Sequence, residues 1–284
     1  MIVRMSLSPM TSEPIHADFL AMACRLARES ADIARTHLDR RAVMRKADDS
    51  VVTQADHAVQ AHILAAIANA YPDHAVCAEE LMKDPGAHAP LGSARYAWVI
   101  DPIDGTRNFA VGLPCYATSI AVLDRGSPIV GAVYEHNLQM MFTAQIGGGA
   151  RLNDQPIDAL HPVDHGDILV GVPSNKDPLT EAVLTRWLAT PGIVYRSLGS
   201  TAYHLGLVAC GALDAMFCKR CKIWDIAAGA LLVTEARGII TDPWGKERLP
   251  FDLTREGGED LPTLAARPHV HALLLKSCYE LLST

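Results

Sequence analysis

The sequence contains no run of about 18 uncharged apolar residues, the length that crosses a bilayer as a helix, so we predict no transmembrane segment. It also contains no long run of lysine or arginine, and its formal net charge is −7. We therefore expect neither a nucleic-acid polymer nor a membrane as a partner. The N-terminal stretch is too polar and too often interrupted for a signal peptide, which favours a cytoplasmic protein.

Cysteine is scarce and scattered, with seven residues, an odd number that suits a reduced compartment better than a disulfide scaffold. Cys218 and Cys221 form an isolated C-x-x-C pair. A structural zinc site usually has a second pair, and a redox pair needs a thioredoxin-like setting, so we expect two ordinary thiols. The twelve histidines are scattered too, and we interpret them as core or surface residues.

What the chain does have is a globular composition, with 49% hydrophobic and 20% charged residues and no internal repeat. Apolar residues at helical spacing predict a helix over 17–45 and a second one that ends at Ala70. Strands are expected over 51–53, 74–80, 95–101, 115–136 (a hairpin turning at 124–127) and 139–145. The first half is thus predicted as two helices followed by an antiparallel meander.

The second half alternates between the two patterns. Strands are predicted over 167–172, 192–197, 213–218, 238–242 and 263–267, and helices over 178–189, 200–211, 224–238 and 268–282. Such alternation indicates a second, smaller layered α/β half. A cluster of proline and glycine near 150–166 suggests the boundary, so we divide the chain into an α+β half over 1–155 and an α/β half over 156–284.

Acidic residues stand at the ends of apolar segments. The stretch WVIDPIDGTRNF (98–109) places Asp101 and Asp104 around a Pro-Ile turn, and we expect a buried strand to stop there. Taken singly, an aspartate before a helix is most often an N-cap, and a Glu-Glu pair is most often solvated surface. The set of acids in such places is Asp56, Glu79, Glu80, Asp101, Asp104 and Asp225.

Several carboxylates that meet in one buried place would repel one another, and divalent cations would remove that cost. A site rich in carboxylates, without clustered histidine or cysteine, favours hard ions. The sequence therefore predicts a site for Mg²⁺, with Mn²⁺ as a possible substitute.

Four segments carry a resemblance to a known family: KADDSVVTQAD (46–56), AEE (78–80), DPIDGTRNF (101–109) and WDIAAGALLVTEARG (224–238). Their order and spacing resemble those of the inositol monophosphatase-like, magnesium-dependent, lithium-sensitive phosphatases. The resemblance extends from about residue 18 to 245. It implies a layered α-β-α-β-α sandwich, a homodimer and a phosphomonoesterase that acts on a small phosphorylated metabolite.

The resemblance also implies roles for individual residues. Glu79, Asp101 and the carbonyl of Ile103 would hold one metal ion, Asp101, Asp104 and Asp225 a second, and Glu79 with water a third. Asp56 and Thr106, with Glu79, would be catalytic, as partners of the attacking water. Gly105 and Thr106 would offer N–H groups to phosphate. Substrate contacts would come from Asp104, Asp225, Gly199, Ser200, Thr201 and the position of Cys218, although Ser200 and Thr201 also suit a plain helix cap.

The chain departs from the family where the inositol enzymes carry a glutamate that binds a sugar hydroxyl, because Cys218 stands there, near Lys219, Arg220 and Lys222. One hypothesis is a substrate with a second anionic group. The alternative is that these cations coat an exposed loop. The default substrate is inositol monophosphate or a related polyol phosphate. The alternatives are 3′-phosphoadenosine 5′-phosphate, fructose 1,6-bisphosphate, histidinol phosphate, or a non-catalytic role.

Overall fold

The computed structural model describes residues 14–38, 43–45, 51–82, 94–160, 166–174, 177–254 and 258–282. Lys46, part of one of the four family-like segments, lies outside these residues. Among the helices of the described ranges, none is long and apolar enough to cross a membrane.

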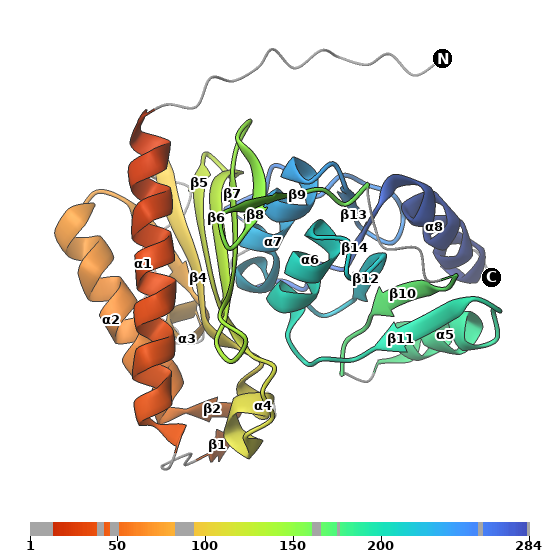
Figure 1. The fold of residues 1–284 in the computed structure, drawn as a ribbon, viewed down its shortest axis with the longest axis horizontal. Coiled ribbons are helices and arrows are strands. Elements are labelled where there is room, and N and C mark those ends of the chain that lie inside the picture. The colour runs from red at the N-terminus through yellow and green to blue at the C-terminus, as the bar shows by residue number, and fades with distance from the viewer. Residues whose placement is uncertain are drawn as a thin grey trace.

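The helices and two sheets stack as α-β-α-β-α layers, which confirms the predicted fold class (Figure 1). One helix pair covers the outer face of the first sheet, a second pair lies between the sheets, and a third covers the outer face of the second sheet. In that order the pairs are α1 (Pro14–Thr36) with α2 (Gln54–Ala70), α6 (Thr201–Ala209) with α7 (Ile223–Glu235), and α5 (Pro178–Leu188) with α8 (Pro268–Leu282).

The first sheet has seven strands in chain order, of which the first pair is parallel and the rest are antiparallel. In β4, Trp98 and Ile100 pack toward α1 and α2, and Ala97 and Val99 pack toward α7, so both faces of the sheet are buried. The strands are β3 (Ala75–Ala78), β4 (Tyr96–Asp104), β5 (Ala117–Asp124), β6 (Ser127–Glu135), β7 (Met140–Gln145), β8 (Gly149–Leu152) and β9 (Gln155–Ile157).

The second sheet has five strands in the order β11-β10-β12-β14-β13, with β10 parallel to both neighbours. They are β10 (Ile168–Gly171), β11 (Ile193–Arg196), β12 (Ala215–Cys218), β13 (Ile239–Thr241) and β14 (Thr263–Ala266). The chain changes sheets between Ile157 and Ile168. Because α6 and α7 share one core with the first sheet, the division into 1–155 and 156–284 stays a prediction.

One predicted helix is too long. α1 ends at Thr36 rather than continuing to residue 45, and β1 (Val43–Arg45) instead pairs antiparallel with β2 (Val51–Thr53). The Thr36 hydroxyl donates to the Ile33 carbonyl at 2.7 Å, a local bond that competes with further helix. The pairing with β2 is a contact that helical periodicity cannot reveal.

Other predicted element ends also shift. β4 does not stop at Asp101 but continues to Asp104. α7 ends at Glu235, and Arg237, not Gly238, takes the left-handed conformation, with φ 69° and an ion pair to Asp158. Besides β1, four short elements were not predicted: α3 (Glu79–Met82), α4 (Thr106–Val111), β8 and β9. The strand predicted over 74–80 ends at Ala78, because Glu79 and Glu80 begin α3.

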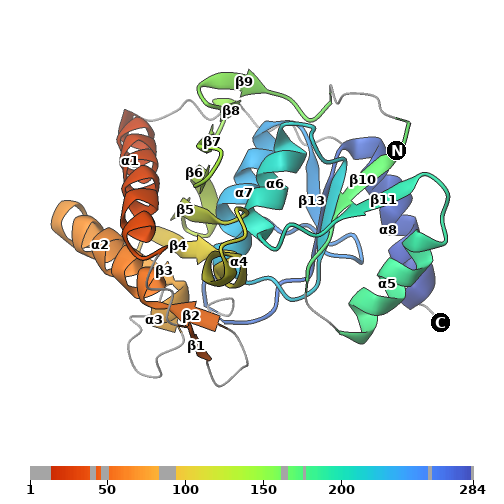
Figure 2. The ribbon, with the colours of Figure 1, turned by 60° about the horizontal axis from the view of Figure 1, so that its bottom comes forward.

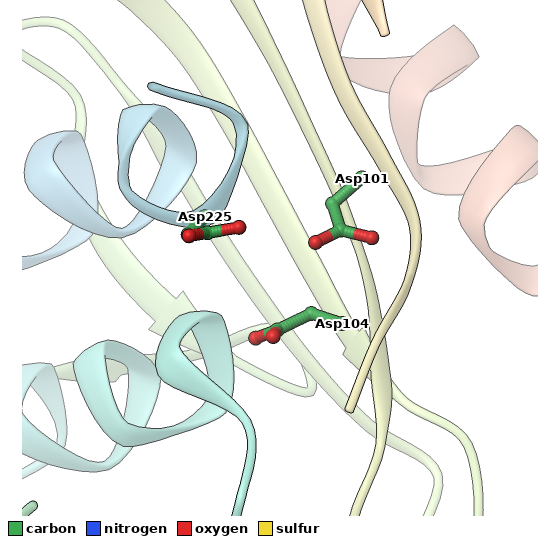
Figure 3. Close-up of side chains that lie close together, drawn as sticks. All are labelled: Asp101, Asp104 and Asp225. Carbon is green, nitrogen blue, oxygen red and sulfur yellow. The ribbon is translucent and has the colours of Figure 1, made fainter. Parts of the chain in front are cut away.

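Small residues let the central helices lie close to their neighbours. A Cβ on Gly229 of α7 would lie 2.4 Å from Leu205 Cδ1 of α6, closer than atoms can approach. Both helices therefore sit deep between the sheets, and their first turns lie near Asp104 of β4 (Figure 3). α4 lies beside the short β1–β2 pair (Figures 1 and 2).

Candidate active site and metal centre

Three carboxylates from two distant parts of the chain converge in one space (Figure 3). One oxygen from each of Asp101, Asp104 and Asp225 lies within 4.8 Å of the others. The first two come from β4, and Asp225 comes from the first turn of α7. Asp101 and Asp104 are buried, and Asp225 is partly exposed. Of the six acids that the sequence analysis singled out, these three therefore lie in one space.

An irregularity in β4 explains how two acids of that strand reach the same space. Residues three apart in a regular strand point to opposite faces. Here Asp101 pairs with Ser119 and Asp104 pairs with Ala117, so two residues of β4 oppose the single residue Thr118. This β-bulge adds the extra residue that turns Asp104 to the side of Asp101.

Asp225 and Asp56 are not N-caps but lie in the first turn of their helices, and each accepts the N–H of the residue that precedes the helix. Asp225 Oδ2 accepts the Lys222 N–H at 2.7 Å, ahead of α7. Asp56 Oδ2 accepts the Thr53 N–H at 2.8 Å and its hydroxyl at 2.6 Å, ahead of α2. These hydrogen bonds fix Oδ2 of each aspartate and leave Oδ1 for other contacts.

The remaining oxygen of Asp56 connects it to the site through Thr106. Thr106 Oγ1 lies 3.1 Å from Asp56 Oδ1 and 3.0 Å from the carbonyl oxygen of Ile103. Because the hydroxyl carries one hydrogen, it donates to only one of the two at a time. Asp56, Ile103 and Thr106 therefore form one contiguous group.

Asp104 is held from the second half of the chain. Its Oδ2 accepts the Ser200 hydroxyl at 2.7 Å and the Ala202 N–H at 2.6 Å. Ser200 is also the N-cap of α6 and accepts the Tyr203 N–H. The Ser200 hydroxyl is thus engaged with Asp104, and its predicted contact with substrate stays a prediction.

Burial and mutual repulsion disfavour the ionised form of these carboxyl groups. Burial first, then nearby acids, raise the pKa of Asp101 and of Asp225 well above the ordinary value. Burial likewise raises the pKa of Asp104 to about 7 and that of Asp56 to about 6. Two ionised carboxylates 4.8 Å apart repel by about 3.5 kcal/mol at an effective dielectric constant of 20.

The donor set fits a metal cation. Asp101 Oδ1 is buried and has no hydrogen-bond partner. Within the described ranges, no Lys, Arg or His side chain forms an ion pair with Asp101, Asp104 or Asp225. A buried cluster of like charges without a protein counter-charge is the setting that a divalent cation stabilises.

A cavity of about 230 Å³ opens beside Asp104 and Asp225, whereas Asp101 is not part of its lining. That volume is below the range of drug-sized pockets, so it suits a small metabolite. Its lining brings in Glu79 from the start of α3 and Arg220 from the loop before α7. The predicted site residues that line it are Glu79, Asp104, Gly105, Thr106, Gly199, Ser200, Thr201, Cys218 and Asp225.

Several residues of this site were not predicted from the sequence. Asn108 Nδ2 donates to the carbonyl oxygens of Cys115 at 2.7 Å and Leu198 at 2.6 Å, which ties α4 to the segment before α6. Its place in the motif DPIDGTRNF was the available signal. Pro173, Ser174 and His204 also line the cavity, and no pattern in the sequence marks them.

Gly105 is required by packing. Its φ is +96°, and a Cβ there would lie 2.9 Å from the Cys115 carbonyl oxygen and 3.3 Å from that of Gly199. The position therefore needs glycine whether or not a phosphate approaches it.

Comparisons with known proteins identify the family of the chain. The sequence model of the inositol monophosphatase family matches residues 16–281. The chain is 35% identical to the putative Nus factor SuhB of Neisseria meningitidis serogroup B, over 91% of this chain and 97% of that protein. It is 32% identical to inositol monophosphatase 1 of Solanum lycopersicum, over 89% and 92%.

A solved structure, the Thermotoga maritima IMPase, superposes with a TM-score of 0.78 at 28% identity, over 94% of this chain and 98% of that one. The chain belongs to the inositol monophosphatase family.

Proposed function

We propose that the protein is a magnesium-dependent phosphomonoesterase that hydrolyses a small phosphorylated metabolite. The observation that supports this most strongly is the convergence of Asp101, Asp104 and Asp225 within 4.8 Å, beside a cavity that Glu79 also lines. Carboxylate oxygens favour Mg²⁺, with Mn²⁺ as a substitute.

Glu79, Asp101 and the Ile103 carbonyl would hold one cation, Asp101, Asp104 and Asp225 a second, and Glu79 a third with water. When bound, such cations supply charge stabilisation for the phosphoryl group and lower the pKa of a coordinated water. Ser200 and the Ala202 N–H fix one oxygen of Asp104 and so leave its other oxygen for binding.

The chain's own proton acceptor is the pair of Thr106 and Asp56. When the Ile103 carbonyl is engaged elsewhere, the Thr106 hydroxyl hydrogen goes to Asp56 Oδ1. The Thr106 oxygen, on the cavity wall, then accepts a hydrogen bond from a water. Asp56, with a pKa of about 6, is ionised at neutral pH and receives the proton.

The default substrate is inositol monophosphate or a related polyol phosphate. The loop before α7 favours a narrower choice, an ester with a second anionic group. Lys219 Nζ lies 3.3 Å from Asp177, and Lys222 Nζ lies 2.9 Å from Asp260, whereas Arg220 lines the cavity. Of the three cations, Arg220 is therefore the one that supports this choice, and its Nε also lies 3.7 Å from Asp260.

Arg220→Gln tests this choice, with Lys219→Gln as the matched control. We expect Arg220→Gln to lower kcat/KM for fructose 1,6-bisphosphate or 3′-phosphoadenosine 5′-phosphate about tenfold, the value of one charge-assisted hydrogen bond, and to change inositol monophosphate turnover little. A wild-type preference for the inositol ester would reject the second anionic group.

The name of the Neisseria relative favours a second candidate function, a Nus factor role without turnover. Against it, all of the predicted acidic metal ligands, Glu79, Asp101, Asp104 and Asp225, are present, and so is Thr106. Homodimerisation, lithium sensitivity and a cytoplasmic location rest on the family resemblance, and we propose them on that ground.

Release of inorganic phosphate from a panel of phosphorylated metabolites, with Mg²⁺ or with EDTA, separates the two functions. We expect Mg²⁺-dependent turnover by the wild type. We also expect Asp104→Asn to lower turnover at least about a thousandfold, although asparagine has the same size and keeps one oxygen that can accept the hydrogen bonds of Ser200 and Ala202. Wild-type turnover in Asp104→Asn would remove Asp104 from the mechanism, and no turnover of any ester would favour the Nus factor role.

A further inference from the structure

The β4 bulge has a hydrogen-bonded support that is separate from the acids. Thr118 of β5 is fully buried, and two residues of β4, Pro102 and Ile103, oppose it at the bulge. Its hydroxyl lies 2.8 Å from the Pro102 carbonyl oxygen and 2.9 Å from Nε2 of His136. A carbonyl that a bulge removes from its ladder needs such a partner.

The direction of these two bonds follows from the donors. The Pro102 carbonyl only accepts, so the single hydroxyl hydrogen of Thr118 goes to it. His136 must then donate its Nε2–H to Thr118, which leaves Nδ1 without a hydrogen. Nδ1 is indeed buried with no hydrogen-bond partner. The chain of donors thus runs from His136 to Thr118 to Pro102.

The His136 ring is held in place for this task. It packs edge-on against Tyr116, with centroids 5.2 Å apart, and lies beside Tyr134 at 6.0 Å. Only 6% of the residue is exposed. The His136 side chain is therefore a buried donor, and within the described ranges its one hydrogen bond leads to the bulge.

We propose that Thr118 and His136 are positioning residues for the metal centre. They hold the Pro102 carbonyl, and with it the spacing of Asp101, the Ile103 carbonyl and Asp104. The proposal rests on the proposed function, because it assumes that these groups bind the cation. Partners that orient metal ligands typically contribute about 10–100-fold to metal affinity.

The test is Mn²⁺ binding to EDTA-treated, dialysed protein, measured by electron paramagnetic resonance of free Mn²⁺. Thr118→Val keeps the shape but removes the hydroxyl, and we expect its Kd to rise about tenfold. Thr118→Ser restores the hydroxyl and should bind within about threefold of wild type. If Thr118→Val fails to fold, His136→Leu provides the test. We expect it to raise the Mn²⁺ Kd about threefold or more relative to wild type.

The chain offers a matched control far from the acids. Thr241 of β13 also lies 2.9 Å from a histidine Nε2, that of His271, and donates to the Asp242 carbonyl at 2.7 Å. Thr241→Val should lower the melting temperature as Thr118→Val does and leave the Mn²⁺ Kd unchanged.

Equal Kd values for wild type, Thr118→Val and His136→Leu would overturn the proposal, as would an equal rise in Thr241→Val. Absence of Mn²⁺ binding in the wild type would instead reject the proposed function, so the two failures are distinguishable.

Discussion

The carboxylate cluster predicts that one substitution will stabilise the metal-free protein while abolishing its response to metal. Asp101→Asn is nearly isosteric and removes one charge from the cluster. It removes up to two repulsions, each about 3.5 kcal/mol at the widest separation of 4.8 Å. Retained protons and solvent reduce this sum of about 7 kcal/mol, and we expect a gain of roughly 1–2 kcal/mol at pH 8.

For a chain of this length, that gain corresponds to a rise in melting temperature of roughly 2–6 °C. The assay is thermal unfolding, followed by circular dichroism, of EDTA-treated wild type and variant. Adding Mg²⁺ should stabilise the wild type by mass action and leave Asp101→Asn nearly unchanged. The order of the two melting temperatures should therefore reverse at saturating Mg²⁺.

Asp214 is the matched control, because it is equally buried but has a counter-charge. Its carboxylate lies 2.7 Å from Arg267, of which 17% is exposed. Asp214→Asn leaves that cation without its partner and should cost about 3 kcal/mol, with or without Mg²⁺. If Asp101→Asn lowered the melting temperature of metal-free protein as Asp214→Asn does, the repulsion argument would be refuted.

Two further predictions concern pH and the turn at Gly105. Burial raises the pKa of Asp56 to about 6 and of Asp104 to about 7, so between about pH 4 and pH 7 the folded metal-free protein binds more protons than the unfolded chain, and its stability falls as pH rises. Because Mg²⁺ displaces those protons, the stabilisation by Mg²⁺ should grow as the pH rises from about 4 to 7. Thermal unfolding at several pH values measures this, and a stabilisation that shrinks over that window would contradict the prediction. Gly105→Ala adds a contact of 2.9 Å to left-handed strain and should cost about 2 kcal/mol or more by urea unfolding, whereas Gly192→Ala, at φ +80° with open space, should cost about 1 kcal/mol; equal costs would contradict the packing argument.

Much of the fold was predictable because its signals are local. The hairpin turn at 124–127 joins β5 to β6 as predicted, since Asp124-Arg125-Gly126-Ser127 is a turn sequence between two apolar runs. The end of α1 and the strand β1 were not predictable, because β1 depends on pairing with β2.

The candidate site, like the fold, was predictable only where its signals are local. Element ends and motif order pointed to the acids, but the sequence suggested a strand that stops at Asp101. What brings Asp101 and Asp104 together is a bulge opposite Thr118, and the pairing of β4 with β5 that creates it is a tertiary contact. Similarly, His136 was one of twelve scattered histidines until the structure placed it beside Thr118.

The most direct measurement of the central claim is anomalous diffraction from crystals grown with Mn²⁺ and phosphate. We expect Mn²⁺ peaks bounded by Asp101, Asp104 and Asp225, with phosphate in the adjoining cavity. If the protein hydrolyses phosphate esters but its crystals show no Mn²⁺ peak at these three carboxylates, the proposed metal centre is contradicted.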